Sequence, residues 1–196
     1  MQMGLPGSSR SLIIGCSATA SGQHGYEATS IEAVLAESGV SRGSLYHHFD
    51  GKEELFRAVL TRVEEQMAVT LAEAARDVTD PVELLRVGCL TFIRLAGDRL
   101  VPRVMLIEAP AVLGWDECRE RDEEHTLGAI RAALADAAVA GRLDPAQVDM
   151  FAHMLLAAMN EVALVIARSD DQAAAHAAGT AAVEEFLRRA LGPPPG

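Results

Sequence analysis

Apolar residues recur at the three- and four-residue spacing of a helix through most of this chain. The longest regular pattern runs from residue 51 to about 76 and places these residues on one stripe: Leu55, Val59, Leu60, Val63, Met67, Leu71 and Ala75. This pattern predicts one long helix. Further helices are predicted over 10–24, from 81 to about 96, from 145 to about 167 and over 173–191, so the expected fold class is all-α.

A short helix is predicted just before the long one. Thr29 and Glu32 have the spacing of a capping box, which predicts a helix that begins at Ser30. Gly39 can adopt a positive φ and end this helix after about two turns. A second cap is predicted at Asp50, where Glu53 stands three residues further on, ahead of the long helix.

Between these caps, Ser41 can cap another helix that runs from Arg42 to His47 or His48. Leu45 and Phe49 are four residues apart and are expected to face inward. Helix, short turn and helix in this spacing predict a helix-turn-helix unit. The helix over 10–24 is expected to pack across the pair.

The outward residues of this second helix are types that contact DNA. An N-terminal Arg can bind guanine or phosphate, Ser and Tyr hydroxyls can bind phosphate, and glycine lets the backbone come close. A lysine in the first turn of the long helix opposes the helix dipole, which favours a phosphate contact instead. The predicted DNA contacts are Thr29, Ser41, Arg42, Gly43, Ser44, Tyr46, His47 and Lys52.

At these residues the chain resembles the TetR (tetracycline-repressor) family of bacterial transcriptional regulators. The resemblance covers about the first third of the chain. Six blocks match the family's N-terminal pattern in order and spacing: Gly25-Tyr26, Ala28-Thr29-Ser30-Ile31, Ser38-Gly39-Val40-Ser41, Gly43-Ser44-Leu45-Tyr46, His48-Phe49 and Lys52-Glu53-Glu54-Leu55. The resemblance implies a homodimer on a near-palindromic operator of double-stranded DNA. It also implies repression that ends when a small molecule enters a C-terminal helical domain.

The first helix departs from the family pattern, because Ala20 and Ser21, followed by Gly22, stand where the family usually has a large apolar or aromatic residue. Glycine in a helix interior costs about 1 kcal/mol relative to alanine, so Gly15 and Gly22 are expected to weaken this helix.

The helix from 145 to about 167 is apolar on nearly all sides and is expected to be buried on several faces. Together with the last helix it is the predicted dimer interface, as the resemblance also implies. The predicted interface residues on these two helices are Leu155, Met159, Val162, Val183, Phe186 and Leu187.

The segment from Ile107 to Trp115 mixes apolar residues with Pro110 and Gly114, which predicts a short helix that ends in a bend. It is either a connector between helices or one wall of a ligand pocket. The predicted pocket residues are Met105, Trp115, His125, Phe151, Met154 and Asn160; equally, the Met-rich stripe can be core, and His125 and His153 can be ordinary core or surface residues. Glu108 is expected to pair with Arg94 or Arg103.

The net charge of −11 argues against binding nucleic acid through bulk positive charge. Residues 1–66 carry five Lys/Arg and eight Asp/Glu, so DNA binding requires a small local set of cations that a dimer doubles.

The three cysteines show no C-x-x-C spacing, and no catalytic motif or metal-ligand cluster is found, so no metal, no cofactor and no enzyme activity are expected. Charged residues interrupt every apolar run, which predicts a cytoplasmic protein without a membrane span.

These features predict an arm over 1–9, a DNA-binding domain over 10–56, a ligand-binding and dimerisation domain over 57–191 and a tail over 192–196. The function predicted is a sequence-specific transcriptional regulator, a repressor released by a small molecule. Two alternatives stay open. The acidic charge and the weak first helix suit a ligand-binding protein of the same fold with weak or lost DNA binding, and the Met-rich helix suits a small helical enzyme that uses an apolar cavity.

Overall fold

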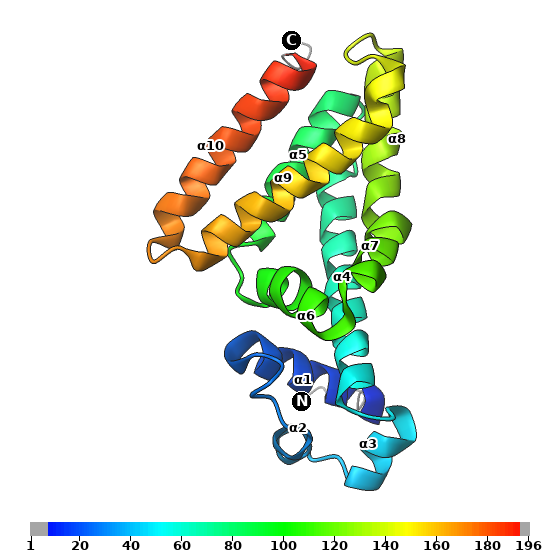
Figure 1. The fold of residues 1–196 in the computed structure, drawn as a ribbon, viewed down its shortest axis with the longest axis vertical. Helices are drawn as coiled ribbons and strands as arrows, with labels where there is room; N and C mark the ends of the chain where they lie inside the picture. The colour runs from blue at the N-terminus through cyan, green and yellow to red at the C-terminus, as the bar shows by residue number, and fades with distance from the viewer. Residues whose placement is uncertain (1–7, 193–196) are drawn as a thin grey trace, which may run out of the picture. The chain divides into compact units, whose positions relative to one another are not determined.

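A computed structural model describes residues 8–192, which form helices joined by short connections and contain no strand (Figure 1). The predicted all-α fold is confirmed. The chain divides into two compact units, Met1–Glu65 with Arg99–Leu113 and Gln66–Asp98 with Gly114–Gly196. Of the predicted arm and tail, only Ser8, Ser9 and Gly192 lie within the described residues.

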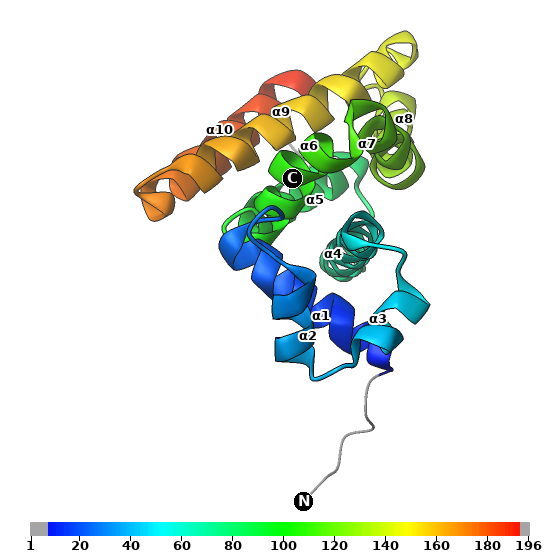
Figure 2. The same cartoon turned by 60° about the horizontal axis from the view of Figure 1, so that its bottom comes forward.

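The first unit contains α1 (Ser9–His24), α2 (Ile31–Ser38), α3 (Arg42–His48), the start of α4 (Lys52–Ala75), the π-helix η1 (Pro102–Glu108) and α6 (Ala109–Leu113). Helix α1 contacts both α2 and α3, as predicted (Figure 2). The core of this unit includes Ile13, Val34, Leu45, Phe49 and Val59, each at most 2% exposed.

Two of the predicted caps are corrected by one residue. Ser30, and not Thr29, caps α2, because its hydroxyl accepts the Ala33 N–H at 3.1 Å. Helix α4 begins at Lys52, and the carboxylate that accepts the Asp50 N–H belongs to Glu54, not Glu53. The turn between α2 and α3 is as predicted: Gly39 has φ 66°, a conformation that favours glycine, and the Ser41 hydroxyl accepts the Ser44 N–H at 3.2 Å.

The lack of bulk in α1 has a packing explanation. Ser17, Ala18, Ser21 and Gly22 are buried. A Cβ atom at Gly22 would lie 3.0 Å from Leu100 Cδ1, so small residues here let the segment from 99 to 113 approach α1 closely.

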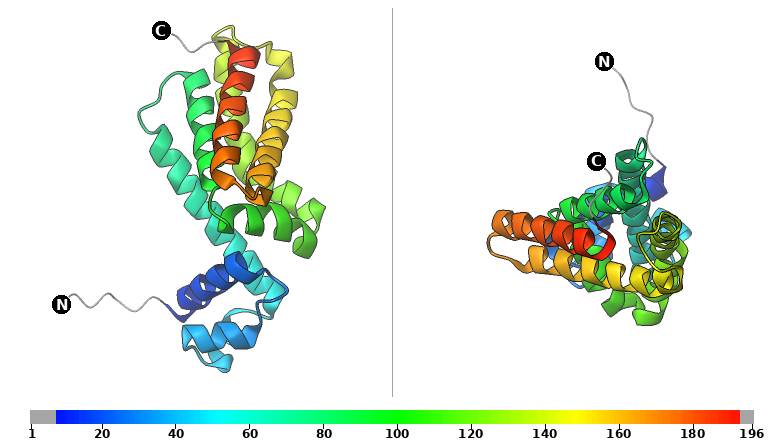
Figure 3. Two further views of the ribbon diagram at one scale, coloured as in Figure 1. Left: turned by 90° about the vertical axis from the view of Figure 1, so that its left-hand side faces the viewer. Right: turned by 90° about the horizontal axis from the view of Figure 1, so that it is seen from above.

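The second unit contains the rest of α4, then α5 (Pro81–Leu95), α7 (Trp115–Asp122), the π-helix η2 (Glu123–Leu127), α8 (Gly128–Val139), the 3₁₀-helix η3 (Pro145–Gln147), α9 (Val148–Arg168) and α10 (Gln172–Leu191). Asp80 caps α5 through the Glu83 N–H at 2.8 Å, as its Asp-Pro start predicts. Helix α10 packs on α5 and α9, and α8 packs on the same two helices (Figure 3).

Helix α9 buries one face and exposes another, so the prediction that it is buried on several faces is wrong. Ala152, Leu155, Met159, Ala163 and Ile166 are buried. On another face, Met150, Met154 and Val165 are 63%, 51% and 56% exposed. Exposed residues on α9 follow helical spacing through positions 150, 154, 157, 161 and 165.

The argument that charged residues interrupt every apolar run of membrane-spanning length is corrected, whereas the expectation of a protein without a membrane span stays a prediction. The segment Pro145–Arg168 is long and apolar enough to do so by length and composition alone. The buried face of α9 forms part of the core of the second unit, and buried core helices of soluble proteins have the same composition.

Candidate nucleic-acid interface

The outer face of α3 carries the predicted DNA-contacting residues on a rigid support. Leu45 is fully buried and Phe49 is 2% exposed, which fixes the helix against the unit. Arg42, Gly43, Tyr46 and His47 are exposed and Ser44 is half-buried. Helix α3, seven residues long and buried on one face, therefore presents an arginine, hydroxyls and an imidazole to solvent on the other.

Arg42 is held by a residue that the sequence did not indicate as part of this surface. Its Nη2 donates to Glu32 Oε1 at 2.6 Å. The hydrogen bond from the backbone N–H of Glu32, followed by that from Arg42, lowers the pKa of Glu32 below its usual value. Glu32 lies in the first turn of α2, and its spacing from Thr29 predicts a capping box instead of this ion pair.

Lys52 lies beside the turn that joins α1 and α2. Its Nζ is 4.2 Å from the centroid of the Tyr26 ring and donates to the Glu27 carbonyl at 3.2 Å. Tyr26 in turn makes an edge-to-face contact with Phe56, with ring centroids 5.1 Å apart. The Lys52 side chain therefore has a defined position. The sequence indicates Tyr26 only as part of the family pattern, and its contact with Lys52 is seen only in the structure.

Thr29 does not belong to this surface, which corrects a predicted phosphate contact. Its side chain is buried, at 5% exposure, and its hydroxyl donates to the Gly25 carbonyl at 2.8 Å. A hydroxyl that is already bonded inside the turn is not available to a phosphate.

The predicted pocket residues differ in their exposure to solvent. Trp115 is 70% exposed, Met154 is 51% exposed, and the side chain of His125 is 57% exposed. Met105, Phe151 and Asn160 are half-buried, with Met105 in the first unit and the other two in the second. A cavity of about 320 Å³ lies elsewhere, between α1 and α4, and is lined in part by Arg10 and Arg62.

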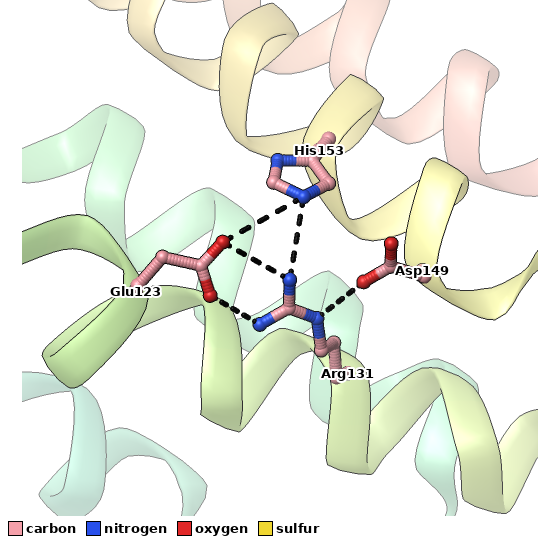
Figure 4. A network of polar contacts seen from close by, with 4 residues as sticks. All are labelled: Glu123, Arg131, Asp149 and His153. Atoms are coloured by element: carbon pink, nitrogen blue, oxygen red, sulfur yellow. Dashed lines mark hydrogen bonds and ion pairs between the residues drawn. The ribbon is translucent and has the colours of Figure 1, made fainter. Parts of the chain in front are cut away.

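His153 belongs to an ion-pair network that joins η2, α8 and α9 (Figure 4). The Arg131 guanidinium donates to Glu123 at 2.6 Å and to Asp149 at 2.6 Å, and its Nη2 lies 3.3 Å from His153 Nε2. These contacts raise the pKa of Arg131, and the hydrogen bond from Arg131 lowers that of Glu123. His153 is a member of a polar network, in line with the ordinary structural role left open for it.

Four of the predicted dimer residues are part of the chain's own core, which corrects their assignment. Leu155, Met159, Val183 and Leu187 are at most 5% exposed and pack in the core of the second unit. Val162 is half-buried, and Phe186 is 38% exposed. The large apolar residues of α9 and α10 that remain exposed are Met150, Met154, Val165 and Phe186.

Two family profiles match the chain. Residues 18–59 match "Bacterial regulatory proteins, tetR family", and residues 82–190 match "Tetracyclin repressor-like, C-terminal domain". The first match contains the helix-turn-helix unit, and the second covers more than half of the chain.

Curated relatives resemble mainly the N-terminal part. The transcriptional regulator LmrA of Bacillus subtilis is 33% identical over 78 residues, which are 39% of this chain and 42% of LmrA. The transcriptional repressor AcnR of Corynebacterium efficiens is 39% identical over 51 residues, or 26% of this chain and 27% of AcnR. These alignments thus span less than half the length of either relative.

Solved structures resemble the chain over nearly its whole length. A TetR-family transcriptional regulator from Pectobacterium atrosepticum has a TM-score of 0.79 at 26% identity, and the match covers 95% of this chain and 96% of that one. AibR, in complex with isovaleryl coenzyme A and operator DNA, has a TM-score of 0.71 at 18% identity, covering 95% of this chain and all of AibR. With the two profile matches, these similarities show that the chain belongs to the tetR family of bacterial regulatory proteins.

Proposed function

We propose that this protein is a sequence-specific transcriptional regulator that places α3 in the major groove of DNA. The observation that carries the proposal is the exposed face of α3, which presents Arg42, Tyr46 and His47. The buried Leu45 and Phe49 hold this helix in place, within the segment that matches the tetR family. Arg42 reaches a base or a phosphate, Ser44, Tyr46 and Lys52 hold phosphates, Ser41 and Gly43 bring the backbone close, and His47 touches a base edge. The named relatives are regulators of transcription, which supports this role over an enzyme.

The regulator acts as a homodimer on a near-palindromic operator. Its interface uses the exposed residues of α9 and α10, in place of the four core residues first assigned to it. Met150, Met154 and Val165 lie on one face of α9, and Phe186 is exposed on α10, where alanines permit close packing. A second copy of the chain would remove this apolar surface from water.

The protein is a repressor that works in the cytoplasm. Its effector is a small molecule that binds in the second unit and causes the protein to release DNA. The match to a tetracycline-repressor-like C-terminal domain supports this part of the proposal, and AibR shows the same fold with an acyl-coenzyme A ligand and operator DNA together. Release requires that the effector favours one of two dimer geometries. We propose that α4, which has residues in both units, transmits this change in dimer geometry to the two copies of α3.

The test of DNA binding begins with selection of duplexes from a random-sequence pool by the purified protein. Binding to the selected duplex is then measured by fluorescence anisotropy at several salt concentrations, because phosphate contacts make affinity fall with salt. Arg42→Ala and Tyr46→Ala are expected to weaken binding at least tenfold, whereas Arg119→Ala, which removes an exposed arginine of α7, is expected to leave it unchanged. Failure to enrich any sequence, or equal losses in all three variants, would overturn the proposal.

A further inference from the structure

One stretch of chain belongs to a different unit from the residues that flank it in the sequence. The segment Arg99–Leu113, which contains η1 and α6, belongs to the compact unit of the helix-turn-helix, although the chain on both sides of it belongs to the other unit. Resting on the proposed function, we propose that Arg103 and Glu108 of η1 form a positioning pair. The pair holds the Gly25-Tyr26 turn, and through Tyr26 it holds the Lys52 ammonium in position for DNA.

The pair grips the end of α1 and the turn that follows it. Glu108 Oε1 accepts the Tyr26 N–H at 2.7 Å, and Arg103 Nη1 donates to the Gln23 carbonyl at 3.1 Å. The two side chains also pair with each other, with Arg103 Nε 3.4 Å from Glu108 Oε1. The expected partner of Glu108 is thus confirmed as Arg103, and its backbone bond to Tyr26 is new.

Gly25 shows how closely the pair approaches the turn. Its φ of +90° favours glycine, and a Cβ atom there would lie 2.7 Å from both Arg103 Nη2 and Glu108 Oε1. The glycine therefore allows the chain to bend after α1 and leaves room for the Arg103 and Glu108 side chains to approach the turn.

The π-helical form of η1 is what brings the pair together. A π-helix closes its hydrogen bonds between residues five apart, so Arg103 and Glu108 lie about one turn from each other on the same face. In an α-helix, five residues correspond to about 140° of rotation away from a common face. A change of η1 to the α-helical register would therefore separate the pair.

The position of the Gly25-Tyr26 turn also fixes the position of Lys52, a predicted DNA contact. Tyr26, whose N–H is held by Glu108, packs its ring against Phe56 and beneath the Lys52 ammonium. Lys52 also donates to the carbonyl of Glu27, the residue that follows Tyr26. Displacement of the Tyr26 backbone would move both partners of Lys52 at once.

The contacts of Glu108 with Arg103 and Tyr26 are of a kind that an effector could break. The side chain of Glu108 is only 12% exposed, and its Oε2 is the one buried side-chain oxygen or nitrogen between residues 8 and 192 without a hydrogen-bond partner. An unpaired buried carboxylate oxygen is unfavourable, so it lowers the cost of leaving this arrangement. Because both ends of the segment continue into the second unit, an effector there can act on η1 through the chain itself.

The test compares the full-length protein with Lys52→Ala, Glu108→Ala and the double variant on the selected duplex. Lys52→Ala is expected to weaken binding and to reduce the slope of log affinity against log salt by about one unit per contact. Glu108→Ala should produce the same loss of slope, although Glu108 does not touch DNA. In the double variant, affinity should match Glu108→Ala within about twofold, because the two substitutions remove one contact.

Two further variants separate positioning from general damage. Glu108→Gln keeps an acceptor for the Tyr26 N–H and is expected to retain most of the slope, and it carries the test if Glu108→Ala does not fold. Asp116→Ala, which removes an exposed carboxylate of α7, is the control for net charge. Hydrogen exchange at the Tyr26 amide should quicken in Glu108→Ala.

Full additivity of Lys52→Ala and Glu108→Ala, or an unchanged slope in Glu108→Ala, would overturn the positioning role while leaving DNA binding intact. Absence of salt-dependent DNA binding by the unaltered protein would instead overturn the proposed function, and this inference with it.

Discussion

Arg42 Nη2 lies 2.6 Å from Glu32 Oε1, so the first residue of α3 is paired with a carboxylate of the preceding helix. The two side chains are 56% and 67% exposed, which leaves the pair open to solvent and to DNA. Under the proposed function, a phosphate that contacts Arg42 would compete with Glu32. We therefore expect Glu32 to tune the DNA affinity of α3 without contacting DNA.

Replacement of Glu32 by glutamine is expected to raise affinity for the selected duplex. The gain should be at most about fivefold, since exposed ion pairs are weak, and it should shrink as salt is added. Glu37→Gln, an exposed carboxylate on the same helix, changes the net charge equally and is the control. Equal gains in both variants would mean that general charge, and not the Arg42 pair, is responsible. The lowered pKa of Glu32 keeps the pair intact until pH falls below the usual range of a glutamate.

The two glycines of α1 should respond differently to alanine. A Cβ atom at Gly15 meets nothing within 4 Å, so Gly15→Ala is expected to raise the free energy of unfolding by about 1 kcal/mol. At Gly22 the new Cβ would crowd Leu100 at 3.0 Å, and the gain should be smaller or reversed. Thermal melts of both variants test this difference. A larger gain at Gly22 than at Gly15 would show that α1 and Leu100 are not in close contact.

The exposed face of α9 should control the oligomeric state. Val165→Glu and Met154→Glu are expected to shift the protein from dimer to monomer in sedimentation experiments and to reduce DNA affinity, with melting of the monomer still cooperative. Val139→Glu, at an 89% exposed residue of α8, should leave the dimer intact. Leu155→Ala should instead destabilise the fold by about 2–5 kcal/mol, because Leu155 is buried within the chain. A dimer unaffected by both glutamates would place the interface elsewhere.

The ion-pair network around Arg131 should stabilise the second unit in a salt-dependent way. Arg131→Gln leaves Glu123 and Asp149 without their shared cation, so the melting temperature is expected to fall. The fall should be smaller in 1 M salt, because all four groups are partly exposed and screened. Arg119→Gln, an exposed arginine of α7, is the control. A loss that is independent of salt would indicate that packing of the Arg131 side chain, rather than its charge, matters.

Cys89 should be inert in the folded protein. Burial raises the pKa of its thiol from 9.0 to about 12, so very little thiolate is present at pH 8. In a variant with Cys16→Ser and Cys118→Ser, a thiol reagent should modify Cys89 only as fast as the protein unfolds. Since the thiol ionises more easily in the unfolded chain, the stability that it contributes is complete below pH 9 and declines as pH rises toward 12. Rapid modification at pH 8 would show that Cys89 is accessible.

The sequence alone determined the elements whose signals act within a few residues. The cap at Ser41, the positive φ at Gly39 and the inward pair Leu45 and Phe49 all depend on neighbours about one turn away, so their spacing was sufficient to predict them. The blocks between residues 25 and 55 also identified the family, because they combine these local requirements with the residue types of a DNA-reading helix.

Only the tertiary structure decided which faces and partners these elements use. Helix α9 is apolar nearly all round, so its periodicity cannot choose between faces; packing on α5, α8 and α10 buries Leu155 and leaves Met154 exposed. Thr29 turns inward because the Gly25 carbonyl lies within reach of its hydroxyl. Glu108 meets Tyr26 across 82 residues of chain, a contact that no local spacing can indicate. Contacts between distant segments depend on how helices pack, and packing is a property of the whole chain rather than of any one stretch.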